Sequence, residues 1–424
     1  ARGRPKLRRP PPQRPKPTLP QPRLQHRHPP RKRTRIHLVI PDPSSQVTAA
    51  DLDARGELTT SPGPSGRTNR SRRINGFRTL SDIAPAAHQA LSAEIWDYVC
   101  GGAGTEATVR RNRKALDRLL LRPRMLRGVA DRDTTTTLLG TPLAFPVVLA
   151  PVGGLSLFTP QGALSVAYAA HATGIVPFVG ILTSPRLEDV AADVNGPLFF
   201  QLYVQGDRSW LTEMVRRVEA AEFSALAVTV DTPIHPRRER DIRNDFVPEK
   251  ARERPNLTGT SRPSTGRDAG RFRMSFDWDE LGWLRSITEL PLVVKGILTP
   301  EDAGLAAELG ADAIYVSNHG GRQLDHAPAT IEMLPAVVQA VAGRAQVIVD
   351  GGFARGTDVV KALALGADAV AIGRLMCWAL AAGGRQGLEH ALHLLQEEVS
   401  VTMAQLGVTT VSALGPESVM TAPA

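Results

Sequence analysis

Eight short apolar segments recur between residues 147 and 372, each bounded by Gly, Pro, Asp or Asn. Each segment has four to six residues, a length that suits a strand and is too short for a helix. Because the apolar residues are consecutive rather than alternating, we expect both faces of each strand to be buried, as in a parallel sheet. The segments are 147–150, 176–179, 198–203, 226–230, 292–295, 313–316, 346–349 and 369–372.

Helical patterns separate most of these segments. The clearest lie at 209–221, 300–309, 328–342 and 357–365. Upstream, 79–98 and 103–120 also have a helical pattern, which predicts a helical extension before the first strand. Eight buried strands that alternate with helices favour an α/β fold, the (β/α)8 TIM barrel. A doubly wound sheet is the alternative, but no GxGxxG motif follows the first predicted strand.

Polar residues and glycines stand where most of the predicted strands end. In a barrel these carboxyl ends meet at one face, which is where catalytic groups gather. A lysine buried after an apolar run, such as Lys295, needs an anionic partner. The residues in these positions are Pro151, Val152, Gly153, Gln201, Tyr203, Thr229, Asp231, Lys295, Ser317, Asp350, Gly351, Gly352, Gly373 and Arg374.

The segment after the sixth predicted strand combines a base with a cation. His319 can take a proton near neutral pH, and Arg322 offers a fork of donors that fits a carboxylate. Gly320 and Gly321 allow the backbone to approach a ligand closely. Such a pair suits chemistry on the carbon beside a carboxylate. The alternative is structural: His319 caps a turn, and Arg322 pairs with a surface acid.

The loops after the last two strands predict a phosphate site. Gly351, Gly352 and Gly373 offer backbone N–H groups, and Arg355 and Arg374 follow them closely. This is the usual place for phosphate in a TIM barrel, and backbone amides with arginine suit that anion. The alternative for Arg374 is an ordinary surface arginine.

Charge and composition separate a tail from the body. The net charge is +9, yet residues 1–40 hold thirteen basic residues and no acid, so subtracting thirteen leaves −4 for residues 41–424. Residues 1–75 are rich in Pro and Arg, which predicts a disordered tail before a barrel domain at 76–424. The tail could instead bind nucleic acid or an anionic surface without specificity.

Cysteine content and hydropathy bear on location. The only cysteines, Cys100 and Cys377, are too few for a disulfide framework and fit a reducing cytoplasm. No apolar run is long enough to span a membrane. The polar stretch 246–278 is either a lid over the active site or a disordered surface loop, and it has no apolar stripe for a membrane surface.

The motif SNHGGRQLD at 317–325 resembles the active-site signature of the FMN-dependent α-hydroxy acid oxidases and dehydrogenases. This family includes glycolate oxidase, lactate oxidase, lactate monooxygenase, mandelate dehydrogenase and 4-hydroxymandelate oxidase. The resemblance covers about residues 76–415. Supporting matches lie at 96–98, 200–203, 229–233, 237–238, 294–296, 350–352 and 372–374.

The resemblance implies a role for each substrate-facing residue. His319 would be the base, and Asp231 would hydrogen-bond its imidazole. Tyr98, Arg238 and Arg322 would hold the substrate carboxylate, and Tyr203 would orient the substrate hydroxyl.

The resemblance also implies the FMN contacts. Gln201 and Thr229 would bond the isoalloxazine ring, and Lys295 would lie near its N1–C2=O edge. Residues 151–153 would bring backbone close to the reactive centre. The remaining contacts would come from Gly180, Ser317, Asp350, Gly351, Gly352, Arg355, Gly373 and Arg374.

Several positions depart from the family pattern. Ala354 stands where the family usually has an arginine beside the phosphate, and Arg355 starts from a different point. Gly180 replaces a serine that contacts the flavin, and Leu182 replaces an aromatic residue of the substrate pocket. Gly153, where oxidases generally have alanine, resembles lactate monooxygenase.

The expected reaction is FMN-dependent oxidation of an L-2-hydroxy acid to a 2-oxo acid, with oxygen favoured as electron acceptor. A dehydrogenase linked to a quinone or protein carrier, or an enzyme like lactate monooxygenase, is the alternative within the family. Outside it, the alternative is a barrel that binds a ligand or nucleic acid without turnover. The resemblance also implies a homo-oligomer, a tetramer or octamer, with neither a specific nucleic-acid partner nor a membrane partner.

Overall fold

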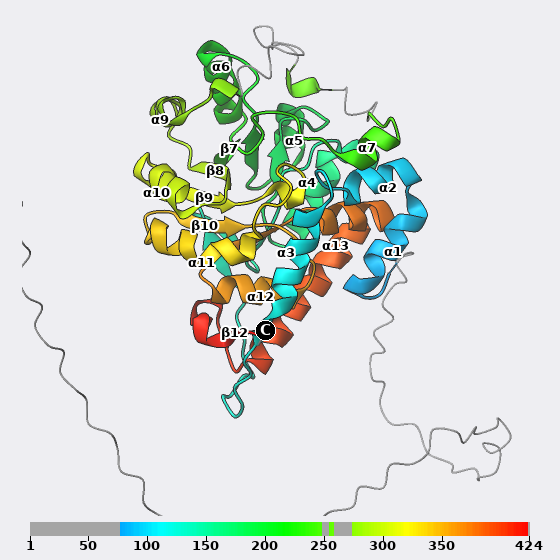
Figure 1. Cartoon of the computed structure of the whole chain (residues 1–424), viewed down its shortest axis with the longest axis vertical. Coiled ribbons are helices and arrows are strands. Elements are labelled where there is room, and N and C mark those ends of the chain that lie inside the picture. Colours follow the sequence, from blue (N-terminus) through cyan, green and yellow to red (C-terminus); the bar gives the residue numbers. More distant parts are fainter. Residues whose placement is uncertain (1–76, 248–253, 258–273, 423–424) are drawn as a thin grey trace, which may run out of the picture. The chain divides into compact units, whose positions relative to one another are not determined.

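Eight parallel strands form the barrel in this computed structural model (Figure 1). They are hydrogen-bonded in the order β4-β11-β10-β9-β8-β7-β6-β5, and a parallel bridge between Leu149 and Pro177 joins the two ends of the sheet. The prediction of a (β/α)8 barrel is therefore confirmed. The strands are β4 (Val147–Leu149), β5 (Phe178–Gly180), β6 (Phe199–Leu202), β7 (Ala225–Thr229), β8 (Leu292–Ile297), β9 (Ala313–Val316), β10 (Gln346–Val349) and β11 (Ala369–Ile372).

Helices surround the strands, as Figure 1 shows, and several begin at side chains that cap them. Asp207 accepts a hydrogen bond from the Trp210 N–H at the start of α6, and Thr299 accepts one from the Asp302 N–H at the start of α10. The outer helices are α4 (Ala163–Ala172), α5 (Leu187–Asp193), α6 (Arg208–Ala220), α9 (Trp278–Ser286), α10 (Pro300–Glu308), α11 (Thr330–Val341), α12 (Gly356–Ala364) and α13 (Arg374–Gln405).

The predicted helical extension is present as α1 (Leu80–Ala90), α2 (Ala93–Cys100) and α3 (Ala107–Arg118), and α1 packs along α13. Two small antiparallel sheets pair β1 (Leu119–Leu121) with β12 (Val419–Thr421) and β2 (Thr136–Leu138) with β3 (Thr141–Leu143). The remaining short elements are α7 (Glu239–Arg243), η1 (Leu155–Leu157), η3 (Pro255–Leu257), η4 (His319–Gly321), η5 (Val411–Ala413) and η6 (Pro416–Ser418).

The structure describes residues 77–247, 254–257 and 274–422. The predicted tail at 1–75 and most of the predicted lid or loop at 246–278 lie outside these residues. The described residues belong to one compact unit, Ser71–Ala424. Among them, no helix has both the length and the apolar character needed to cross a membrane.

Candidate active site

The base predicted from sequence lies in a tight left-handed turn at the end of β9. His319, Gly320 and Gly321 have φ values of 57°, 64° and 78°. A left-handed histidine is strained, and such strain is usually retained where function requires it. The Asn318 side chain stabilises the turn because its Oδ1 accepts a hydrogen bond from the Gly321 N–H at 3.1 Å. The turn therefore holds the imidazole in one orientation.

The imidazole lies between a carboxylate and a phenol. Nδ1 of His319 is 3.0 Å from Oδ1 and 3.1 Å from Oδ2 of Asp231. Nε2 is 3.5 Å from the hydroxyl of Tyr203, which comes from the end of β6. The structure thus brings together the three residues predicted to be catalytic, from the ends of three different strands.

Burial and charge set the protonation of this group. Burial lowers the pKa of His319 below its ordinary value, and the nearby Lys295 charge lowers it further, although Asp231 opposes both. Burial raises the pKa of Asp231, but the Lys295 charge and the hydrogen bond from His319 hold that pKa below its usual range. The pair therefore rests as a neutral imidazole beside a carboxylate.

Two guanidinium groups lie beside the imidazole. Arg322 donates from one nitrogen to the carbonyls of Tyr98 and Gly101, at 2.6 and 2.9 Å, and its Cζ lies 5.1 Å from the centre of the Tyr98 ring. Nε of Arg238 lies 3.4 Å from the Arg322 carbonyl. Burial and the charge of Arg322 lower the pKa of Arg238 to about 10. Among the described residues neither group forms a salt bridge, and the Asp241 charge acts on both only from a longer distance, so an anion can still bind them.

A buried polar cluster lines the adjacent strand ends. Lys295, which is 3% exposed, donates to Oγ of Ser317 at 3.2 Å and lies 3.9 Å from Oδ2 of Asp350. Ser317 in turn donates to Oδ1 of Asp350 at 2.8 Å. On the neighbouring strands, Nε2 of Gln201 donates to Oγ1 of Thr229 at 2.8 Å. These residues form a continuous polar floor beside His319.

Small residues keep the space above this floor open. A Cβ added at Gly180 would lie 3.2 Å from Oε1 of Gln201 and 3.9 Å from Cβ of Pro151. A Cβ added at Gly153 would lie 3.2 Å from Cβ of Leu182. The segment 151–153 follows β4 directly, so its backbone faces the same end of the barrel.

The predicted phosphate loops follow β10 and β11. Gly351 and Gly352 have φ values of 110° and 91°, which only glycine adopts readily. A Cβ added at Gly373 would meet only the Ala150 Cβ, at 3.9 Å, so this position is open. The helix α13 begins directly after Gly373, which directs its N-terminus to this place. The N–H groups at the start of α12 already have partners, because Ala354 and Arg355 donate to Asp358 and Gly356 donates to Glu398.

The two arginines predicted to bind the phosphate, Arg355 and Arg374, both use their guanidinium groups to bind other parts of the protein. Arg355 is paired with Glu398 at 2.6 Å and donates to Oγ of Ser81 at 2.7 Å. Arg374 donates to three backbone carbonyls, at distances of 2.8 to 3.0 Å. These carbonyls belong to Val99, Gly101 and Gly320. Arg374 therefore joins the end of α2 to the turn that carries His319.

Comparison with known proteins agrees with this geometry. The pattern of the family described as "FMN-dependent dehydrogenase" matches residues 87–421. The chain belongs to this family. As a family member it is an enzyme that uses FMN to oxidise 2-hydroxy acids, and its predicted family, fold, activity and cofactor are confirmed.

Two characterised relatives are oxidases. A peroxisomal (S)-2-hydroxyacid oxidase of Arabidopsis thaliana is 43% identical over 338 residues, which cover 78% of this chain and 93% of the relative. An L-lactate oxidase of Nostoc sp. is 44% identical over 343 residues, which cover 77% of this chain and 94% of the relative.

Two solved structures have the same fold. A mandelate oxidase complex matches with a TM-score of 0.74 at 43% identity, over 81% of this chain and 99% of the other. A soluble mutant of the membrane-associated (S)-mandelate dehydrogenase from Pseudomonas putida matches with a TM-score of 0.76 at 34% identity, over 82% of this chain and 100% of the other.

The residues of this FMN-dependent dehydrogenase fit its cofactor. Lys295 is a buried cation whose ion-pair partner Asp350 lies 3.9 Å away, beyond hydrogen-bonding distance, so it suits the negative charge of a reduced flavin. The amide of Gln201 and the hydroxyl of Thr229 can bond ring heteroatoms. At the other end, the open position at Gly373 beside the N-terminus of α13 suits a phosphate.

The enzyme also depends on residues that sequence reasoning missed. Asn112 of α3 exchanges two hydrogen bonds with Asn318, at 2.9 and 2.8 Å, and so supports the His319 turn from 206 positions away. Arg240 pairs with both Asp97 and Glu106, at 3.0 and 2.7 Å, which ties α7 to α2. An asparagine inside an arginine-rich helix gives no sequence signal of such a contact.

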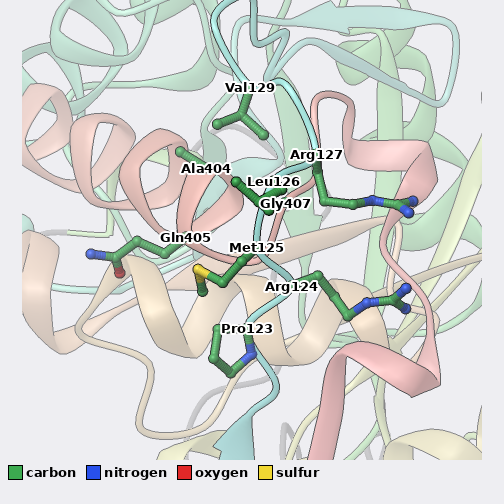
Figure 2. A pocket seen from close by; sticks show the side chains of 9 residues that line it. All are labelled: Pro123, Arg124, Met125, Leu126, Arg127, Val129, Ala404, Gln405 and Gly407. Carbon is green, nitrogen blue, oxygen red and sulfur yellow. The ribbon is translucent and has the colours of Figure 1, made fainter.

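One surface pocket lies apart from the active site. Figure 2 shows a pocket of about 450 Å³ that is lined by the segment between β1 and β2 and by the end of α13. Leu126 and Met125 lie on its rim, fully and largely exposed. None of its lining residues comes from the carboxyl end of a barrel strand, so it is separate from the catalytic groups.

Proposed function

We propose that this enzyme oxidises an (S)-2-hydroxy acid to the 2-oxo acid with His319 as base and oxygen as electron acceptor. The observation that carries the proposal is the imidazole of His319, held 3.0 Å from Asp231 and near two guanidinium groups that form no salt bridge within the described part of the chain. A base next to an anion site is what removal of a proton from a 2-hydroxy acid requires.

Arg322, Arg238 and Tyr98 would bind the substrate carboxylate. Arg322 is held by the two carbonyls at the end of α2, so its remaining donors have a fixed direction. A fixed fork positions a planar carboxylate and, with it, the adjacent carbon. The substrate hydroxyl then faces Nε2 of His319 and the phenol of Tyr203, which are 3.5 Å apart.

Proton transfer would run to Nε2, because Nδ1 faces the Asp231 carboxylate. The charge of Asp231 stabilises the imidazolium that forms. The chemistry that FMN would supply when bound is two-electron oxidation of the substrate carbon. Lys295 would hold negative charge at the cofactor, and Ser317 and Asp350 would orient its ammonium group.

Oxygen is favoured as the acceptor because several relatives are named as oxidases. A carrier-linked dehydrogenase is the second candidate, since another structural neighbour is a mandelate dehydrogenase. Gly153 supports a third, a reaction like that of lactate monooxygenase, because the Cβ that most oxidases carry there would sit against Leu182.

The test is anaerobic mixing of the purified holoenzyme with glycolate, L-lactate and (S)-mandelate. We expect the flavin to bleach with at least one of them, and oxygen to restore the colour with one hydrogen peroxide for each 2-oxo acid. Bleaching that only a quinone or dye reverses would replace oxygen by a carrier. Carbon dioxide release without peroxide would indicate the monooxygenase reaction.

Three further features belong to the same proposal. The two free cysteines, Cys100 and Cys377, support a cytoplasmic location. The exposed Met125 and Leu126 are compatible with a homo-oligomer, a tetramer or octamer.

A barrel domain that starts at residue 76 predicts that deletion of residues 1–70 leaves flavin content and turnover intact. Loss of flavin from the truncated protein would contradict this domain boundary.

A further inference from the structure

A buried tyrosine lies in the barrel interior next to Lys295. Tyr315 of β9 has no exposed surface, and it is the direct cross-strand neighbour of Lys295 in β8. Its ring centre lies 5.8 Å from that of Phe178, which belongs to β5 on the opposite wall. The phenol therefore points into the barrel, below the polar floor of the active site.

The hydrogen bonding of the Tyr315 hydroxyl is unusual for a fully buried group. The hydroxyl makes no hydrogen bond of ordinary geometry among the described residues, although a buried hydroxyl normally makes one, and Asp350 interacts with it only weakly. Asp350 follows β10, and Tyr315 pairs in register with Ile348, so the two side chains point to the same face of adjacent strands. Burial raises the pKa of Tyr315 well above its ordinary value, and the Asp350 charge raises it further.

Lys295 is held weakly by its other neighbours. Its ammonium donates one hydrogen bond, to Ser317, and lies 3.9 Å from the Asp350 carboxylate. The same ammonium lies 5.0 Å from the centre of the Tyr315 ring, within the range of a cation–π contact. The ring of Tyr315 thus contacts Lys295. The hydroxyl of Tyr315 approaches Asp350, which is the acid that attracts Lys295.

We propose that Tyr315 is a positioning residue that raises the reduction potential of bound FMN through Lys295 and Asp350. The inference rests on the proposed place of Lys295 beside the flavin. A hydroxyl directed at Asp350 weakens the pull of that carboxylate on the ammonium, and the ring stabilises the cation where water is absent. Because of both effects, the positive charge of Lys295 is less neutralised by Asp350 and better able to stabilise the anion of reduced FMN.

The test is the two-electron midpoint potential of the holoenzyme, measured against a reference dye. Tyr315→Phe should make the potential more negative, by about a threefold to tenfold change in the oxidised-to-reduced ratio, where tenfold is about 30 mV. Tyr315→Leu removes the ring as well and should shift the potential further in the same direction. Phe178→Leu, the matched control, alters the same interior packing and should leave the potential unchanged.

A purely structural role predicts a different result. Removal of an unpartnered buried hydroxyl should leave the melting temperature of Tyr315→Phe equal or higher, with no change in potential. An unchanged potential in Tyr315→Phe would overturn the inference. In Asp350→Asn the further change to Phe at position 315 should have little effect, because the proposed coupling runs through that carboxylate.

Lys295→Met separates this inference from the proposed function. If Lys295→Met lowers the potential and Tyr315→Phe does not, only the role of Tyr315 is wrong. If Lys295→Met leaves the potential unchanged, the placement of Lys295 beside the flavin is wrong, and the inference is lost with it. Titration of each apo-protein with FMN shows that the variants compared are fully loaded.

Discussion

Asp231 determines which nitrogen of His319 is free to take a proton. Both carboxylate oxygens lie within 3.1 Å of Nδ1, so Nδ1 carries the hydrogen and Nε2 is left as the acceptor facing Tyr203. Burial lowers the pKa of His319, and in the proposed reaction the Asp231 carboxylate would stabilise the charge that the ring acquires. The proton would move from the substrate hydroxyl to Nε2 of His319.

Replacement of the base should separate cofactor binding from chemistry. In His319→Gln we expect bound FMN to remain, because the side chain contributes to the substrate side, and reduction by 2-hydroxy acids to be lost. Anaerobic bleaching of the flavin after mixing with substrate measures this directly. Normal bleaching in the variant would remove His319 from the role of base.

Asp231→Asn should slow the reduction of the flavin by substrate and should also shift the pH–rate profile of that reduction. The Asp231 charge raises the pKa of His319, so its loss lowers that pKa further. Activity that requires a neutral imidazole rises as pH rises through this pKa, so the rising limb should move to lower pH in the variant. The plateau rate should fall by roughly 10²–10⁴ because the imidazolium loses its counter-charge. A limb that moves to higher pH would contradict the assignment.

Arg322→Lys should be far from conservative. A lysine cannot reach the carbonyls of Tyr98 and Gly101 and a substrate carboxylate at once, whereas the planar fork of Arg322 can. We expect kcat/KM to fall by the equivalent of about 2–4 kcal/mol in transition-state binding. Arg344→Lys, at an exposed arginine that pairs with Glu308, is the matched control and should leave kcat/KM unchanged.

The sequence predicted the strands well because each consists of consecutive apolar residues with turn residues on both sides. Placement of the polar groups at one barrel face follows from the fold class, since parallel strands all end there. The directions in which individual side chains point could not be predicted from the sequence or from the fold class. Arg355 and Arg374 stand where a phosphate would need them, yet both side chains turn to other partners.

Such partners are invisible along the chain because they depend on tertiary packing. Glu398, which binds Arg355, is 43 positions away on α13, and the Val99 carbonyl that accepts from Arg374 is 275 positions away. No local pattern encodes which of several anions or carbonyls a long, flexible guanidinium will find. The cross-strand pair of Lys295 and Tyr315 is of the same kind, because it depends on the register of two strands.

The position of Arg355 leads to a prediction about FMN affinity. Its guanidinium is already paired with Glu398 and bonded to Ser81, so it does not substitute for the arginine absent at position 354. Ala354→Arg would add one charge-assisted contact to the phosphate, worth about 1.5–3 kcal/mol when well placed. We therefore expect this variant to bind FMN about ten- to a hundredfold more tightly than the natural chain in titrations of apo-protein at fixed salt.

Riboflavin, which lacks the phosphate, is the matched ligand for this test. Ala354→Arg should leave riboflavin affinity unchanged, because the added guanidinium has nothing to bind at that end of the ligand. Glu398→Gln weakens the pairing of Arg355 with position 398. This variant should bind FMN more tightly only if the released Arg355 side chain can reach the phosphate. Equal FMN dissociation constants for the natural chain and Ala354→Arg would mean that the glycine-lined loops and the N-terminus of α13 already satisfy the phosphate without a guanidinium.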